Sequence, residues 1–330
     1  SIKMVFPWSS PKITSPLQGR GGKTLMSFLS PKEIEELYTA QFHRRSRRGT
    51  TYDAERPLTP EDLRILNQFA KRLTSEYVGA NIIIVTGNKD IATMFKLGFF
   101  SFAKNPVGCV IFNYDEKKIS LENASFCFEL FILKCTAMKL ATCWMAGSYS
   151  KATARAIGGG VEPYCVSPIG YFSKDVPAKK LAIRKCADDG RKFVSSRDPR
   201  RIRKTIPAFR DWDAAVKHGC DCGTIAPTAI NRQAFVYNRV HSEHPQYESI
   251  AKVLLENGMD SKIVEGTMDE KPVFYTVECK KPGDIMGYAY KNDAGIVSSH
   301  VALGCMAKGI KPECMMMRSD DPLMCLVVVV

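Results

Sequence analysis

The chain has 330 residues, of which 45% are hydrophobic and 25% are charged; these values are typical of globular proteins and exclude a disordered chain. No run of about 18 uncharged apolar residues occurs, and Ser1–Pro7 lacks the basic-then-apolar pattern of a signal peptide, so neither a membrane span nor a leader is expected. The net charge of +13 is concentrated in residues 174–204, which hold 12 basic and 4 acidic residues, a surplus of 8. Because no recognition motif accompanies this cluster, we expect no nucleic-acid partner.

The elements are predicted in chain order from capping signals and hydrophobic spacing, beginning with an irregular arm over residues 1–28. Ser30-Pro31-Lys32-Glu33 and Thr59-Pro60-Glu61-Asp62 each combine an N-cap hydroxyl, a proline and an acidic third residue, so each predicts the start of a helix. Further helices are predicted for 121–140, 150–157, 206–222, 247–256 and 293–308, the last with Asp293 as its cap. Strands are predicted for 81–86, 107–114, 164–172, 273–278 and 323–330, with a turn at 226–235 leading into one more. The second half therefore repeats the layout of the first.

The 12 cysteines have no regular spacing, which favours reduced thiols in a cytoplasmic protein. Cys220 and Cys222 lie close to His218, and a zinc site is one interpretation of this cluster. Such a site needs two ligand pairs at tetrahedral geometry, whereas residues 213–222 favour a helix, on which i and i+2 side chains point to different faces. We therefore interpret these cysteines as packing residues and keep zinc as the weaker alternative.

Arg44-Arg45-Ser46-Arg47-Arg48 follows the first predicted helix. Guanidinium groups bind phosphate oxygens in pairs, so this segment suits an anionic ligand; basic residues that merely offset a helix dipole are the alternative. The segment resembles the Arg-x-Ser-x-Arg signature of the FMN-dependent nitroreductases. The resemblance implies that Arg44, Ser46 and Arg48 hold the phosphate and ribityl groups of FMN and that Arg45 lies near the pyrimidine edge of the flavin.

Three later segments resemble the same family. Residues 141–147 (ATCWMAG) are similar to the family's turn beside the flavin ring, with Ala141 and Ala146 at positions where glycine is usual. Residues 226–235 (APTAINRQAF) resemble an element that reaches the flavin from the partner subunit in ordinary nitroreductases, with Ala234 and Phe235 in place of Pro-Trp. Residues 293–300 resemble a late family helix, which we interpret as packing. The resemblance implies flavin contacts from Trp144, Met145, Ala146, Gly147, Pro227, Thr228, Ala229, Asn231 and Gln233, and a cation beside the phosphate from Arg191.

The arginine segment and the 226–235 element lie about 180 residues apart, in different halves of the chain. This arrangement resembles the single-chain, tandem nitroreductase-like subfamily. It implies an α+β, nitroreductase-like fold in which two halves, residues 29–193 and 194–330, each have a mixed β-sheet packed by helices. The halves would form an intramolecular pseudo-dimer around one flavin, and the protein would be a monomer.

The resemblance implies a cytoplasmic NAD(P)H oxidoreductase in which FMN carries the redox chemistry. NADH or NADPH would reduce the flavin and leave, and a small-molecule electron acceptor such as a nitroaromatic or quinone would follow in a ping-pong cycle. Cys143 has no basic partner in the local sequence, and no side chain is assigned as acid or nucleophile. Because fold does not fix substrate, dehalogenation or thiol oxidation on this fold stays open. The replacements at 146, 234 and 235 leave a catalytically degenerate, flavin-binding or anion-binding member as the alternative.

Overall fold

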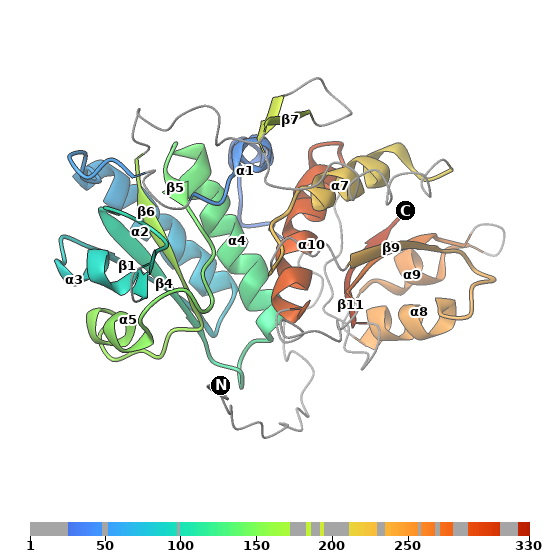
Figure 1. The fold of residues 1–330 in the computed structure, drawn as a ribbon. Helices are drawn as coiled ribbons and strands as arrows, with labels where there is room; N and C mark the ends of the chain where they lie inside the picture. The colour runs from blue at the N-terminus through green and yellow to red at the C-terminus, as the bar shows by residue number, and fades with distance from the viewer. Residues whose placement is uncertain are drawn as a thin grey trace.

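The computed structural model describes residues 26–47, 52–97, 100–171, 183–185, 192–194, 211–229, 235–256, 259–267, 271–279, 290–310 and 323–330. Four predicted site residues, Arg48, Arg191, Asn231 and Gln233, lie outside these ranges, as do residues 1–25 of the predicted arm and most of the basic stretch. The fold is α+β, with a sheet in each half and helices on both faces of each sheet (Figure 1).

The elements follow the predicted order closely. The described helices are α1 (Pro31–His43), α2 (Pro60–Glu76), α3 (Asp90–Met94), α4 (Leu121–Ala137), α5 (Lys151–Ile157), α7 (Ala214–Thr224), α8 (Tyr247–Glu256), α9 (Ser261–Glu265) and α10 (Tyr290–Met306). The described strands are β1 (Ala80–Thr86), β2 (Lys96–Leu97), β3 (Phe100–Ser101), β4 (Gly108–Tyr114), β5 (Ala141–Thr142), β6 (Cys165–Gly170), β7 (Ile183–Lys185), β8 (Lys192–Val194), β9 (Phe235–Val240), β10 (Phe274–Cys279) and β11 (Leu323–Val329).

The two predicted capping boxes are both present. The Ser30 hydroxyl accepts a hydrogen bond from the Glu33 amide, and the Glu33 carboxylate accepts one from the Ser30 amide. Thr59 and Asp62 make the same reciprocal pair at the start of α2. Local sequence therefore determines where these two helices begin. In addition, Arg72 of α2 pairs with Glu33, so the start of α1 is tied to α2.

This pair makes one prediction about acid stability. The hydrogen bond from Arg72 is the main reason that the pKa of Glu33 falls to about 2, against the opposing effect of partial burial. Because the folded-state pKa lies below the unfolded value of about 4.3, the carboxylate stabilises the fold above that pH, and this stabilisation is lost as the pH falls toward 2. We expect Glu33→Gln to lower the free energy of unfolding at neutral pH by about 1 kcal/mol, and to lower it less near pH 3.

Urea unfolding at the two pH values measures this difference. Glu35→Gln is the matched control, because Glu35 is an exposed residue of the same helix that, among the described residues, accepts a side-chain hydrogen bond from Thr39 alone. Equal losses in the two variants, or a loss from Glu33→Gln that does not depend on pH, would contradict the prediction.

The sheet of the first half has the order β1-β4-β6-β5, and all of its strand pairs are antiparallel. Alternate side chains of β4 pack into two different hydrophobic cores, one on each face of the sheet. Val110 and Phe112 pack with α2 and α4, whereas Cys109 and Ile111 pack with α3 and α5. This alternation is the period-two pattern of a strand buried on both faces.

The sheet of the second half has the order β11-β10-β9, again with antiparallel pairs. Tyr275 and Val277 of β10 pack toward α7 and α10, and Phe274 packs toward α8 and α9. The layout of the first half is therefore repeated. The predicted mixed sheets would also contain parallel pairing. Among the described residues, parallel pairing occurs as isolated bridges, and in the first half only.

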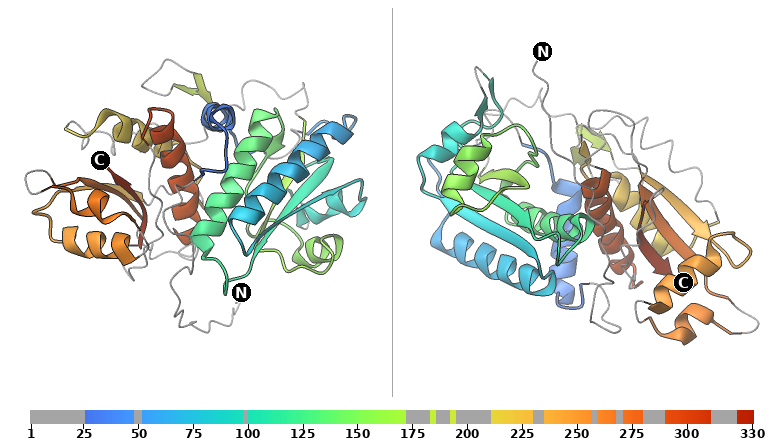
Figure 2. Two further views of the ribbon diagram at one scale, coloured as in Figure 1. Left: turned by 180° about the vertical axis from the view of Figure 1, so that it is seen from behind. Right: turned by 90° about the horizontal axis from the view of Figure 1, so that it is seen from below.

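Helices α4 and α10 lie side by side in the middle of the molecule and join the halves (Figures 1 and 2). They approach closely at Gly295 of α10: a Cβ there would overlap the carbonyl oxygen of Glu122 and lie 2.9 Å from the amide nitrogen of Phe126. On its other side α10 contacts α7 through the glycines Gly219 and Gly223. The predicted boundary at 193/194 falls inside β8 and remains a prediction.

One predicted helix start was wrong, and another falls outside the described residues. Helix α7 begins at Ala214, where the Asp213 carboxylate caps it by accepting from the amides of Ala215 and Val216; the start predicted at 206 lies outside the described residues. Helix α10 begins at Tyr290, so Asp293 lies within its first turn and is not the cap.

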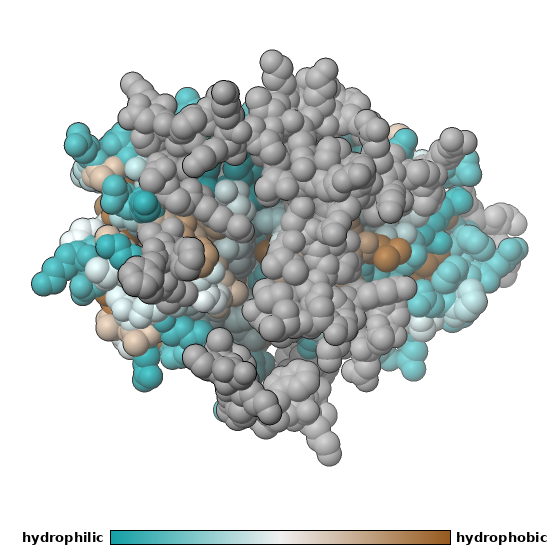
Figure 3. All heavy atoms as spheres, in the orientation of Figure 1, coloured by the Kyte–Doolittle hydropathy of each residue, from teal (hydrophilic) through white to brown (hydrophobic). Residues whose placement is uncertain are grey.

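The surface over α8 and α9, at the right of Figure 3, is mainly hydrophilic. This is expected of an α8 that buries only Tyr247, Ile250 and Leu254. In the described part of the chain, no helix combines the length and the apolar content needed to cross a membrane.

Candidate functional site

The arginine segment lies beside the tryptophan turn, residues 144–147. Arg44 ends α1 in an extended conformation. Ser46 then forms a parallel bridge with Thr142 of β5, and the Arg47 amide donates to the Thr142 carbonyl oxygen at 2.9 Å. The backbone thus places two segments that are about 100 residues apart in the sequence next to each other.

Glu129 of α4 is the centre of a buried polar cluster. Its Oε2 accepts a hydrogen bond from the indole Nε1 of Trp144 at 2.6 Å, and its Oε1 lies 2.9 Å from Nε2 of His300 on α10. Nε of Arg44 lies 3.7 Å from the same Oε1. Glu129 and His300 are fully buried, and Arg44 is 8% exposed. One carboxylate therefore contacts three of the four segments that carried the resemblance.

Sequence reasoning did not identify Glu129 as a site residue. A signal was present, because Glu129 is the only charged residue in the mainly apolar stretch from Ala124 to Leu133. A charge in such a position is seldom buried without a partner. His300 was interpreted as packing, and its hydrogen bond to Glu129 adds a polar contact between the two halves.

The arginines of the segment differ in their surroundings. Burial lowers the pKa of Arg44, and the charge of Glu129 partly opposes that effect. Partial burial, helped by the positive charge of Arg47, lowers the pKa of Arg45 to about 10. Arg45 makes no hydrogen bond or ion pair within the described residues. It is therefore a half-buried positive charge that an anionic group would stabilise.

The first two residues of the tryptophan turn are anchored to the first half, and the last two are exposed. The indole of Trp144 stacks on Phe112 with ring centroids 5.4 Å apart, and the backbone of Met145 exchanges two hydrogen bonds with Val166. Ala146 and Gly147, which follow, are exposed. A Cβ added to Gly147 would meet no atom of the described residues within 4 Å. The two exposed residues leave room for a ligand to approach their backbone.

The third of the segments that carry the resemblance, residues 226–235, is hydrogen-bonded to α10. Pro227 is buried, while Thr228 and Ala229 are half-buried, and the Ala229 amide donates to Oδ1 of Asp293 at 2.8 Å. Asp293 lies seven residues, or about two turns, before His300, so the two side chains leave the same side of α10. Helix α10 therefore contacts the 226–235 element through Asp293 and the first half through His300.

The cysteine and histidine cluster is part of the packing between α1 and α7. Nε2 of His218 lies 2.9 Å from the Tyr38 hydroxyl and 3.7 Å from Sγ of Cys222, and Cys220 and Cys222 are buried. Among the described residues no group of three His, Cys, Asp or Glu side chains is arranged to hold a metal ion. The nine cysteines whose side chains the structure describes are all buried with free thiols. Cys143 is 2% exposed, and its amide donates to Oγ of Ser167.

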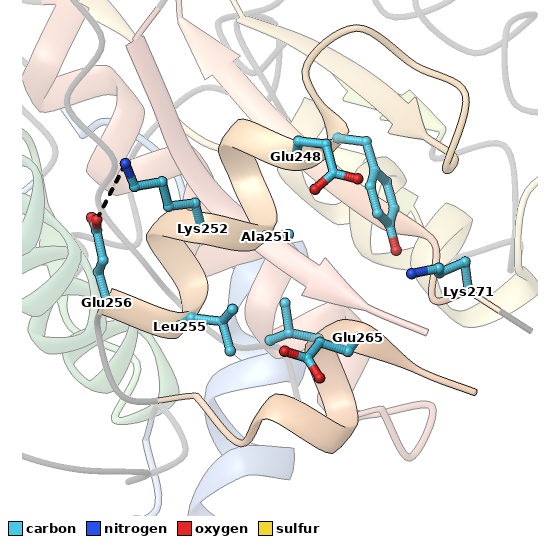
Figure 4. Close-up of a pocket in the computed structure, with 9 residues that line it drawn as sticks. Glu248, Ala251, Lys252, Leu255, Glu256, Glu265 and Lys271 are labelled. Atoms are coloured by element: carbon cyan, nitrogen blue, oxygen red, sulfur yellow. Dashed lines mark ion pairs between the residues drawn. The ribbon is translucent and has the colours of Figure 1, made fainter. Parts of the chain in front are cut away.

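A separate cavity of about 280 Å³ lies between α8 and α9 (Figure 4). Glu248, Lys252 and Glu256 of α8 and Glu265 of α9 are among the residues that line it, and Lys252 pairs with Glu256 at 3.9 Å. None of the predicted site residues that the structure describes lines this cavity. We therefore place the candidate site at the Glu129 cluster and the tryptophan turn.

Comparison with known families decides the class of the protein. The model of a family described as "Putative TM nitroreductase" matches residues 36–305. The chain belongs to this nitroreductase family. The match includes Arg44, the tryptophan turn and His300, so it spans both halves of the candidate site. A comparison with curated proteins found no match.

Solved nitroreductase structures resemble the chain at low identity. A nitroreductase from Thermotoga maritima is 14% identical, with a TM-score of 0.49; the alignment covers 88% of this chain and 93% of that one. An FMN-dependent nitroreductase from Clostridium difficile is 18% identical, with a TM-score of 0.32, and covers 43% of this chain and 94% of its own. A nitroreductase family protein from another strain of the same species is 15% identical, with a TM-score of 0.32, and covers 46% and 96%.

Proposed function

We propose that this nitroreductase is an FMN-dependent NAD(P)H oxidoreductase that reduces nitroaromatics, quinones or similar flat electrophiles. The main support is the convergence of the separated segments. Arg44, Trp144 and His300 all contact the carboxylate of Glu129, and Ala229 is held by the same helix as His300. The match to the nitroreductase family model, which spans all of these residues, supports the same class of chemistry.

The chemical groups that the structure provides suit FMN. Arg45 is half-buried and has no anionic partner in the described part of the chain, as a phosphate-binding guanidinium would be in the absence of phosphate. Next to it, the hydroxyl of Ser46 supplies a neutral donor. The exposed backbone of Ala146 and Gly147 leaves room for a planar ring. Cation, hydroxyl and open turn are adjacent through the bridge between Ser46 and Thr142.

The structure leads us to assign different roles to the arginines. We propose that Arg45, Ser46 and Arg48 bind the phosphate and ribityl groups, while Arg44 remains on Glu129. Met145, Ala146 and Gly147 would lie along the ring, with Thr228, Asn231 and Gln233 approaching from the second half and Arg191 adding positive charge. When bound, FMN supplies the redox chemistry by taking up two electrons and a proton from NAD(P)H and passing them to the acceptor. The protein binds, orients and encloses the reactants.

Anaerobic titration of the purified protein, incubated with FMN and freed of excess, tests this function. We expect retained flavin absorbance that bleaches on addition of NADH or NADPH and returns when a quinone or nitroaromatic is added. Protein that takes up no FMN would overturn the proposal. Protein that retains FMN but is reduced by neither nucleotide would instead support the degenerate, flavin-binding alternative.

A further inference from the structure

A single buried carboxylate receives contacts from both halves of the chain. Oε2 of Glu129 accepts from Trp144, which begins the tryptophan turn of the first half, at 2.6 Å. Oε1 lies 2.9 Å from His300, on the central helix of the second half. With a carboxylate as acceptor, the His300 nitrogen in this contact is the donor. Each oxygen of Glu129 is thus used by a different segment of the candidate site.

Stability alone gives little reason for a charge at this position. The neighbouring Phe128 and Leu130 are fully buried apolar residues, and an apolar side chain at 129 would avoid the cost of removing a carboxylate from water. Buried ion pairs are often no more stabilising than apolar residues of similar volume. What an apolar side chain could not do is fix the directions of two N–H groups at once. The carboxylate at position 129 therefore fixes the orientation of the Trp144 and His300 side chains.

The contacts of Glu129 determine the position of the tryptophan turn and of α10 together. The turn has two anchors: the indole of Trp144 on Glu129, and the backbone of Met145 on Val166. The exposed Ala146 and Gly147 follow directly. On the other side, His300 fixes α10, whose Asp293 holds the amide of Ala229. A shift at Glu129 would move both sides of the proposed flavin site.

We propose that Glu129 is a positioning residue of the flavin site, which holds the tryptophan turn and α10 in the geometry that binds FMN and orients it for reduction. This inference rests on the proposed function. It assigns Glu129 a role through Trp144 and His300, not a contact with the reacting atoms.

Glu129→Gln and Trp144→Phe test the inference by two different routes. An amide oxygen accepts from one N–H while the amide NH₂ faces the other, so Glu129→Gln weakens one of the two contacts. Trp144→Phe keeps an aromatic ring but removes the indole donor. We expect each variant to raise the dissociation constant of FMN about 10-fold and to slow reduction at saturating FMN by a similar factor. The double variant is expected to lose less than the product of the two effects, because both changes act on the same buried hydrogen-bond cluster around residue 129.

Glu122→Gln is the matched control, since Glu122 is a buried acid two turns earlier on the same helix, and its Oε1 has no hydrogen-bond partner among the described residues. It should retain wild-type FMN affinity and reduction rate. The dissociation constant is measured by fluorescence of bound and free FMN, and folded protein is quantified by circular dichroism. Wild-type protein that binds no FMN would overturn the proposed function and this inference with it. Wild-type binding together with unchanged affinity and rate per folded molecule in both test variants would overturn the inference alone.

Discussion

Gly295→Ala is expected to lower the free energy of unfolding by about 3 kcal/mol. The added Cβ would overlap the carbonyl oxygen of Glu122 and lie 2.9 Å from the amide nitrogen of Phe126. Both are backbone atoms of α4, so no side-chain rotation relieves the overlap, and the two central helices must separate. This cost outweighs the gain of about 1 kcal/mol that alanine has over glycine inside a helix. Denaturant unfolding of FMN-free protein measures the net effect.

Gly147→Ala is the matched control for that experiment. Gly147 has a φ outside the left-handed region, and in the described part of the chain a Cβ added there meets no atom within 4 Å. The substitution should leave the stability of FMN-free protein within about 0.5 kcal/mol of wild type. A loss from Gly295→Ala no larger than the small change expected for Gly147→Ala would show that α4 and α10 are not packed as closely as described.

Arg45→Ala is expected to reduce FMN affinity by about 10-fold to 100-fold, the range for loss of a charge-assisted hydrogen bond. Arg45 is half-buried, is near the like charge of Arg47, and makes no ion pair within the described residues. Removing it should therefore leave the free energy of unfolding unchanged or slightly higher. Affinity would then fall without a loss of stability, which is the signature of a residue retained for its ligand.

Arg64→Ala provides the comparison, because Arg64 is exposed on α2 and pairs with the neighbouring Glu61 at 2.6 Å and with Gln68. We expect its removal to change FMN affinity by less than about two-fold. Fluorescence titration with FMN, combined with urea unfolding of the same samples, measures both quantities. Equal affinity losses at positions 45 and 64 would mean that the arginine segment only offsets the helix dipole at the end of α1.

The sequence predicted best those features that depend on neighbouring residues. The starts of α1 and α2 follow from reciprocal bonds between residues three apart. The strand order could not be derived in this way, because the pairing of β4 with β6 joins residues more than 50 positions apart. Asp293 shows the limit clearly: it resembles a cap in sequence, but in the fold its carboxylate accepts from the distant amide of Ala229.

The site was predicted in outline but without its centre. The arginine segment and the tryptophan turn were identified separately by resemblance, and the bridge between Ser46 and Thr142 now joins them. Glu129 belongs to neither segment. Only the packing of α4 against α10 shows that its carboxylate reaches Trp144 and His300. Long-range polar contacts of this kind leave no local pattern in a sequence.

The shared carboxylate also restricts how this sequence can change over time. A variant that loses Trp144 or His300 leaves a buried charge with too few donors, which is costly. A variant that loses Glu129 first leaves an indole and an imidazole N–H without an acceptor. Positions 129, 144 and 300 are therefore coupled, even though they lie up to 171 residues apart. A substitution at one of them is tolerated best after a compensating change at another.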